Sequence, residues 1–221
     1  MHLVLHFPFI SLLLLAVLTS RLKVKLPGLT GNMSVNLPFL LLAIVQLSLL
    51  EAALIACASS LVQSLPRQGK PLKPIQVLFN VSTLTAAAGF SHVVFRGHLW
   101  PGSNGFLETP SLVLAAGAFF LANTTPVATI ISLTEGAKVV RTWFAIVHLS
   151  FPYYVAAAGI TSIVTAMKQG TDWRLLTTVF PVMLVIYSSY RIYFGLAVMG
   201  VPSASQLSWS QFVKGRAAGA S

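Results

Sequence analysis

Charge, and negative charge above all, is what this sequence of 221 residues lacks: 8% of its residues are charged, and Asp and Glu together number 4. Soluble domains carry roughly 25% charged residues, so the composition excludes an ordinary soluble protein. The chain is instead 56% hydrophobic, with a mean hydropathy of +0.82. We expect an all-α, polytopic integral membrane protein with six to seven helical segments.

Motifs for catalysis and metal binding are also lacking. The single cysteine, Cys57, excludes an internal disulfide, and its apolar neighbours indicate core packing. The five histidines are scattered, without HExxH spacing or a carboxylate pair. Of these, His92 and His148 are each able to ligate a tetrapyrrole, although a histidine isolated in a membrane helix is more often a packing residue. We therefore predict no catalytic residues, no metal site and no cofactor, and a protein that is not an enzyme.

The formal charge of +10 raises nucleic acid as a partner. Here, however, the basic residues lie in loops beside apolar segments, without interleaved aromatic residues. Orientation in the bilayer and contact with anionic lipid headgroups explain this pattern better. The expected partners are membrane lipids and either a partner membrane protein or further copies of the chain, with no nucleic acid.

The apolar stretch over residues 36–66 decides the topology. As one helix it would be roughly 43 Å long and strongly tilted in a hydrocarbon core of roughly 30 Å. A capping box formed by Ser48 and Glu51 instead predicts a break, with Asn36 as the N-cap of the first half. Two short helices over 37–65 would form a hairpin with both flanks on one side of the membrane, whereas one long helix would place them on opposite sides.

The distribution of Lys and Arg favours the hairpin. With it, ten basic residues lie inside and three outside, whereas one long helix gives seven and six. An excess inside is what the positive-inside rule describes, so we predict a bacterial inner-membrane protein with a cytoplasmic C-terminus. The ten are Arg21, Lys23, Lys25, Arg67, Lys70, Lys73, Lys138, Arg141, Lys214 and Arg216.

The remaining apolar segments complete one transmembrane domain over residues 1–200, followed by a short polar tail over 201–221. The N-terminal segment has no basic residues before its apolar run, so we interpret it as a retained helix rather than a signal peptide. Besides the hairpin, helices are expected over 3–19, 75–95, 111–133, 143–167 and 175–198.

Two asparagines near predicted helix starts are candidate ligand-binding residues. Asn36 ends a connector over 21–36 that is rich in turn residues, and such a connector either lines a site or is an ordinary interfacial loop. Asn80 shares one helix face with Gln76 and Thr83. That polar stripe either binds a ligand or forms hydrogen bonds between helices, which is the commoner role.

Three further candidates lie later in the chain. Asn123 and Thr124 precede Pro126, whose missing N–H frees a backbone carbonyl within an apolar segment. Such a position either builds a binding site or is a simple kink. Arg191 lies within the last segment and is able to extend to the inner surface.

Five segments resemble the membrane-embedded N-terminal sensor region of bacterial HD-GYP phosphodiesterases and GGDEF diguanylate cyclases: KLPGLTGNMSVNLPFLLL (25–42), KPIQVLFNVST (73–83), ANTTPVATIISLTEG (122–136), FPYYVAAAGI (151–160) and PVMLVIYSSYRIYFG (181–195). In those proteins the last helix leads into a cytoplasmic signalling domain. We expect no such output domain in this chain, so the resemblance implies a sensor that passes its state to a partner chain. The pattern LPG…SVNLPFLLLA is also faintly similar to substrate-binding subunits of vitamin uptake transporters.

We therefore expect a non-enzymatic sensor-like domain that binds a small ligand or lipid and signals through a partner, with the site lined by Asn36, Asn80, Asn123, Thr124 and Arg191. The alternatives are an accessory structural subunit of a larger membrane complex, packing through the small residues over 156–159, and a substrate-binding subunit of a transporter.

Overall fold

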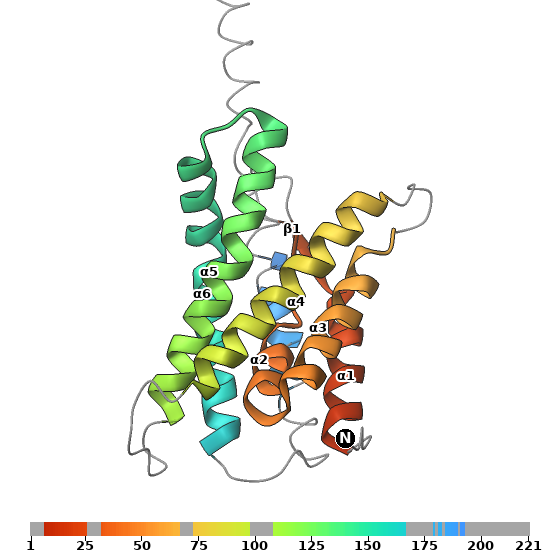
Figure 1. The fold of residues 1–221 in the computed structure, drawn as a ribbon, viewed down its shortest axis with the longest axis vertical. Coiled ribbons are helices and arrows are strands. Elements are labelled where there is room, and N and C mark those ends of the chain that lie inside the picture. The colour runs from red at the N-terminus through yellow and green to blue at the C-terminus, as the bar shows by residue number, and fades with distance from the viewer. Residues whose placement is uncertain are drawn as a thin grey trace, which may run out of the picture.

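The computed structural model describes residues 7–25, 32–66, 73–97 and 108–166, and most positions between 179 and 192. In this part of the chain the elements are α1 (Phe7–Ser20), β1 (Lys23–Lys25), β2 (Asn32–Ser34), α2 (Leu37–Gln46), α3 (Leu49–Ser64), α4 (Pro74–Arg96), α5 (Glu108–Glu135) and α6 (Val139–Ala166) (Figure 1). The described positions between 179 and 192 are helical as well. The predicted all-α fold with six to seven helical segments is confirmed.

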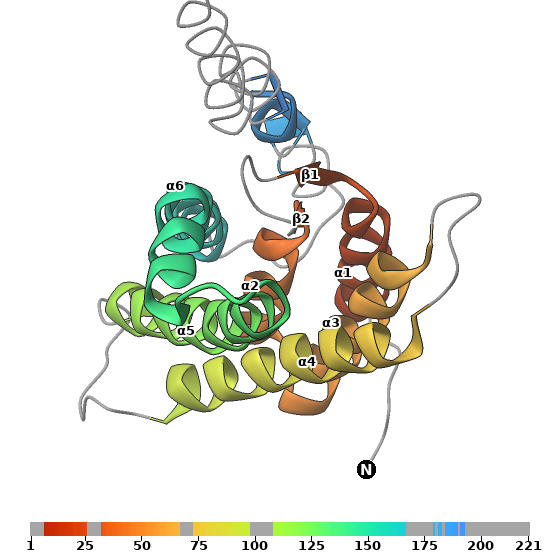
Figure 2. The same ribbon diagram turned by 90° about the horizontal axis from the view of Figure 1, so that it is seen from above.

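One helix, α2, lies at the centre of the molecule. Seen from above, α1, α3, α4, α5 and α6 follow one another in an arc around it, and α2 contacts four of them: α1, α3, α4 and α6 (Figure 2). Its sequence, LPFLLLAIVQ, is apolar on every side, and nine of its ten residues are buried. A helix that is hydrophobic all round is stable only where protein or lipid surrounds it. Here neighbouring helices enclose it.

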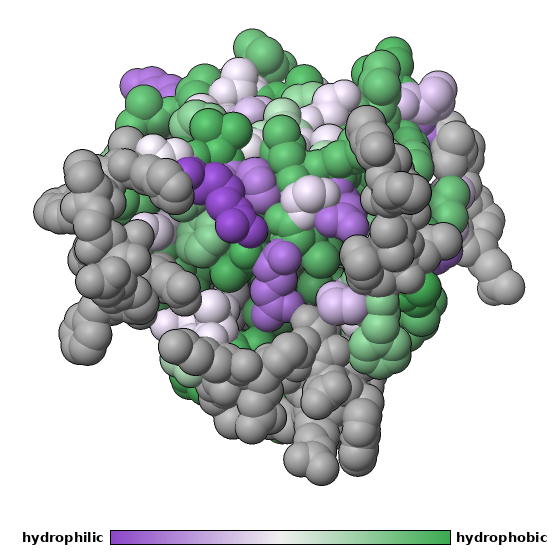
Figure 3. All heavy atoms as spheres, turned by 60° about the horizontal axis from the view of Figure 1, so that its bottom comes forward, coloured by the Kyte–Doolittle hydropathy of each residue, from purple (hydrophilic) through white to green (hydrophobic). Residues whose placement is uncertain are grey.

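The outer helices carry the membrane-facing surface. Among the described helices, α4, α6 and the Pro110–Glu135 part of α5 are long and apolar enough to cross a membrane. They leave large apolar side chains uncovered, among them Ile75, Leu78 and Leu133. Hydrophobic side chains also cover much of the face in Figure 3, where hydrophilic ones gather near the middle. This is a membrane protein with transmembrane helices.

The predicted break at Ser48 is present, and its capping box is formed as expected. The hydroxyl of Ser48 accepts the N–H of Glu51 at 3.4 Å, and a carboxylate oxygen of Glu51 accepts the N–H of Ser48 at 3.0 Å. Both donors would otherwise lack a partner at the start of α3. Asn36 does occupy the N-cap position of α2, but its side chain makes no capping hydrogen bond.

Contacts with α4 show that the chain reverses at this break. Ile44, near the end of α2, contacts His92 near the end of α4, whereas Ser64, at the end of α3, contacts Asn80 near the start of α4. The two halves, α2 and α3, therefore run in opposite directions. In Figure 1, α3 rises from the turn after α2 and lies between α1 and α4. The hairpin prediction is confirmed, and the alternative of one long helix is wrong.

The connector before α2 contains a short antiparallel ladder that the sequence pattern did not predict. Strands β1 and β2 pair with Lys23 opposite Ser34. The N–H of Val35 then donates to the carbonyl of Leu22 at 3.2 Å. These bonds hold the start of α2 beside the end of α1. Consequently Asn36 is fixed near one end of the bundle.

Both prolines inside the long helices are accommodated without a break. Pro126 lies within the continuous helix α5 and Pro152 within α6. The helix α5 instead ends at Glu135, and the following Gly136 has a φ of +68°, the left-handed conformation that favours glycine after a helix. The predicted polar position at Pro126 is therefore part of a helix, and its neighbours are presented on a helical surface.

Candidate functional site

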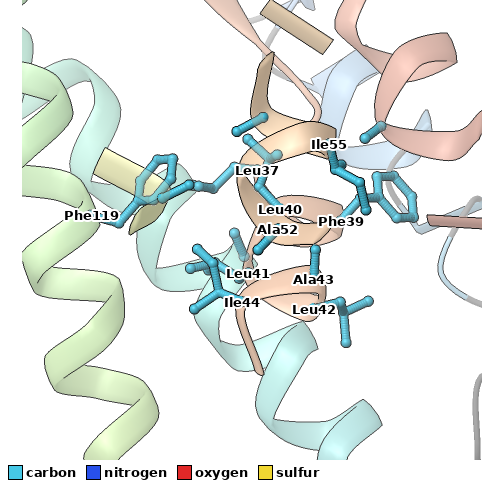
Figure 4. Packing of buried hydrophobic residues seen from close by; sticks show 14 of the residues in the cluster. Leu37, Phe39, Leu40, Leu41, Leu42, Ala43, Ile44, Ala52, Ile55 and Phe119 are labelled. Atoms are coloured by element: carbon cyan, nitrogen blue, oxygen red, sulfur yellow. The ribbon is translucent and has the colours of Figure 1, made fainter. Parts of the chain in front are cut away.

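The start of α2 meets α6 at Tyr153. The backbone N–H of Leu37 donates to the Tyr153 hydroxyl at 3.2 Å, although the residues are 116 positions apart. Tyr153 is 1% exposed and Leu37 is 4% exposed. The first N–H groups of a helix have no partner within that helix. The Tyr153 hydroxyl, which belongs to the neighbouring helix α6, supplies the acceptor for Leu37. Figure 4 shows Leu37 packed among other buried hydrophobic residues, among them Leu40 and Phe119.

Next to this contact lies a buried amide without a partner. Asn36 is 4% exposed, and its Nδ2 atom has no hydrogen-bond partner. Within the described residues, this holds for three buried side-chain atoms, the others being Thr85 Oγ1 and Ser132 Oγ. Because most buried polar groups in proteins are paired, an exception marks a place where a water molecule or a ligand binds.

The second tyrosine of the pair, Tyr154, contacts α5. Its hydroxyl accepts a hydrogen bond from Nδ2 of Asn123 at 2.9 Å. Its ring lies edge-on to Phe120 with centroids 4.7 Å apart. The rings of Tyr153 and Tyr154 are themselves 6.2 Å apart. A continuous set of contacts therefore leads from the start of α2 through α6 to α5.

We define a polar cluster of five residues. Four are joined by these contacts, namely Leu37 through its backbone N–H, Tyr153, Tyr154 and Asn123, and the fifth is Asn36, which directly precedes Leu37 in the chain. They come from three segments that the sequence analysis singled out separately, over 25–42, 122–136 and 151–160. The tyrosines were not among the predicted site residues. Their signal was two adjacent hydroxyl-bearing rings in an apolar helix, since a buried Tyr hydroxyl usually finds a hydrogen-bond partner.

The other predicted site residues lie outside the polar cluster. Asn80 donates to the Ser64 hydroxyl at 3.2 Å and so joins α4 to α3, which is the helix-packing alternative considered for it. Thr124 is buried beside Asn123, but its hydroxyl donates to the Phe120 carbonyl of its own helix at 2.7 Å. Arg191 is exposed on the last described helical positions. Of the five candidates, Asn123 contacts the tyrosine pair directly, and Asn36 directly precedes Leu37, whose N–H binds Tyr153.

At its other end, α2 is held by α4. Nδ1 of His92 lies 3.0 Å from the carbonyl oxygen of Ile44, and a guanidinium nitrogen of Arg96 donates to the carbonyl of Val45 at 3.2 Å. Because a carbonyl only accepts, this contact is a hydrogen bond in the forms of His92 that carry a proton on Nδ1. His92 and Arg96 thus each bind one carbonyl near the end of α2. His148 is exposed on α6.

No metal centre forms in the part of the chain that the structure describes: His, Cys, Asp and Glu nowhere gather there in groups of three or more.

Comparison with known proteins gives one finding. A family model described as MASE9 matches residues 1–187, which include the helices α1 to α6. MASE domains are membrane-associated sensor domains of signalling proteins, and they are not catalytic. No curated protein and no solved structure matches the chain.

Proposed function

This chain belongs to the MASE9 family of membrane-associated sensor domains, and we propose that it binds a small ligand or a lipid headgroup at the polar cluster and signals the bound state to a partner protein in a bacterial inner membrane. The match to the family covers residues 1–187 and thus the whole polar cluster.

One observation carries the ligand-binding part of this proposal: the Nδ2 atom of Asn36 is buried without a partner at the start of the central helix. An unpaired buried donor costs about 1–3 kcal/mol. A ligand that accepts a hydrogen bond from this nitrogen would remove that cost. The free energy gained would be available only in the bound state, which is the requirement for a sensor.

The contacts of the polar cluster also provide a route for signalling. A ligand at Asn36 would lie next to the Leu37–Tyr153 bond, and Tyr153 and Tyr154 both belong to α6. Further along the chain, Ile186 and Tyr187 pack against the same core. A shift of α2 on ligand binding would therefore be felt by α6 and by the helical positions that follow it.

The test is to purify the full chain in mild detergent and to identify by native mass spectrometry what remains bound. Asn123→Leu removes the hydrogen bond to Tyr154, and we expect it to abolish ligand retention while expression is unchanged. Asn80→Leu is the matched control, since Asn80 is also half-buried in a long helix but bonds to Ser64 outside the polar cluster. Unchanged retention in Asn123→Leu would exclude Asn123 from the site.

The same purification separates this proposal from the two alternatives. An accessory subunit would co-purify with a protein and no small molecule. Its proposed contact face, over 156–159, is only partly available, because Ala157 is buried within the bundle and Gly159 is exposed. A transporter subunit would also retain a small molecule, but together with further transport components.

A further inference from the structure

We infer that the ligand group bound at the start of α2 is an anion, a carboxylate or a phosphate. The inference rests on the proposed function, because it names the chemical class of the ligand at the polar cluster. It depends on whether the groups at the start of α2 donate or accept hydrogen bonds, and on the sign of the charge around them.

The first turn of α2 presents donors only. The first bond of the helix runs from the N–H of Leu40 to the carbonyl of Asn36. Ahead of it, Pro38 has no N–H, and the N–H of Leu37 donates to Tyr153. The backbone N–H of Phe39 is therefore the donor that an N-cap side chain normally accepts in the first turn. A helix N-terminus carries the equivalent of about +0.5 elementary charge and favours anions. Burial strengthens this preference, since less water screens it.

Asn36 adds a further donor where an acceptor is expected. An asparagine at the N-cap usually turns its oxygen toward the first-turn N–H groups. Here no capping bond forms, and the buried atom without a partner is the amide nitrogen. Two donors at the same helix end are not able to satisfy each other. An anion placed at this helix end would accept a hydrogen bond from the Asn36 amide and lie at the positive end of the helix dipole.

The surrounding charges favour the same sign. Lys23 lies opposite Ser34 in the ladder, two residues before Asn36. Glu51 belongs to the break at the opposite end of the hairpin. A cation at Asn36 would thus meet a helix N-terminus and an amide donor. An anion is the ligand class that this environment stabilises.

Two sources would supply such a group: the phosphate of a lipid in the adjoining leaflet, or a soluble carboxylate or phosphate. The experiment separates them with the full chain in nanodiscs. In the first arm, discs of phosphatidylcholine receive inorganic phosphate or acetate, with chloride at the same ionic strength as the reference. In the second arm, phosphatidylglycerol replaces part of the phosphatidylcholine and no anion is added.

Thermal unfolding is followed by the reaction of Cys57 with a fluorogenic thiol dye, because Cys57 is the single cysteine and is partly buried in α3. At a ligand concentration of about ten times its Kd, we expect the unfolding midpoint to rise by about 3–6 °C in the arm that contains the true source of the anion. A rise with phosphate or acetate assigns a soluble anion, and a rise with phosphatidylglycerol assigns a lipid.

Two substitutions at Asn36 test where the anion binds. Asn36→Leu removes the donor and is expected to abolish the rise, whereas Asn80→Leu, the control at the other asparagine, retains it. Asn36→Asp supplies a carboxylate at the N-cap covalently. We expect this variant to unfold at a higher temperature than the wild type without added anion, and to show no further rise. It decides the question even if Asn36→Leu fails to fold.

The inference is overturned if neither arm raises the midpoint, or if Asn36→Asp responds to the anion as the wild type does. Failure of the proposed function has a different signature. In that case nothing co-purifies and Asn123→Leu behaves as the wild type, yet the anion still raises the midpoint through Asn36. A co-purifying neutral or cationic molecule that is lost in Asn123→Leu would instead support sensing and reject the anion.

Discussion

Replacing Tyr153 by Phe should separate a buried backbone N–H from its acceptor while the ring itself is kept. The hydroxyl of Tyr153 accepts the N–H of Leu37 at 3.2 Å. Because both residues are buried, water does not replace the lost oxygen. A stranded buried donor costs about 1–3 kcal/mol, and the retained ring leaves no large cavity. We therefore expect the free energy of unfolding to fall by about 2 kcal/mol.

The neighbouring tyrosine provides the matched control. Tyr154→Phe removes a hydroxyl of the same kind, but its partner is the half-buried side chain of Asn123, which is free to rotate toward another acceptor. Side-chain hydrogen bonds between membrane helices average about 0.6 kcal/mol. Loss of the bond between Tyr153 and the backbone of α2 should therefore lower the free energy of unfolding about three times as much as loss of the bond between Tyr154 and α5.

Both variants are compared by the thiol-dye assay at Cys57. For a chain of this size, about 1 kcal/mol corresponds to a midpoint shift of roughly 2–4 °C. Tyr153→Phe should therefore lower the midpoint by about 4–8 °C and Tyr154→Phe by about 1–2 °C. Equal shifts, or a larger shift for Tyr154→Phe, would refute the argument that the start of α2 depends on an acceptor from α6.

Three further predictions concern the hairpin. Ser48→Ala removes the capping hydroxyl at the break and should cost about 1 kcal/mol, measured as a lower unfolding midpoint together with faster amide exchange in the first turn of α3. In a Cys57→Ser background, cysteines placed at Lys23 and Lys70 should both be protected from a membrane-impermeant thiol reagent in intact cells; labelling of just one would contradict the shared cytoplasmic side of the two flanks. His92→Ala leaves the Ile44 carbonyl of α2 without its donor, which should cost about 1–3 kcal/mol of unfolding free energy and lower the unfolding midpoint by several degrees. An unchanged midpoint would show that His92 on α4 does not hold this end of α2.

Local motifs made the hairpin predictable. The capping box of Ser48 and Glu51 lies within four residues, so its geometry depends only on the adjoining backbone. The basic flanks added a second, independent indication of a reversal. In contrast, the ladder of β1 and β2 has three residues in each strand, which is too short for an alternating pattern to appear.

The candidate site was only partly predictable, because its contacts join distant segments. Asn80 and Asn123 have equivalent settings in the sequence, each within an apolar helix beside hydroxyl-bearing residues. Their roles differ because α4 lies against α3, where Ser64 is the partner, and α5 lies against α6, where Tyr154 is the partner. Which helices are neighbours follows from packing of the whole bundle, and a pattern within one helix does not contain it.

The enclosure of α2 has a consequence for how the protein is made. Ten residues of helix span about 15 Å, half of the hydrocarbon core, so α2 is too short to insert as an independent crossing. Its walls include α6, whose Tyr153 is synthesised 116 residues after Leu37. The interior thus closes only when most of the polypeptide has left the ribosome, and until then the nascent hairpin depends on lipid or an insertion factor for cover. Substitutions in α6 should therefore lower the yield of membrane-inserted protein even where the protein that does insert is as stable as the wild type.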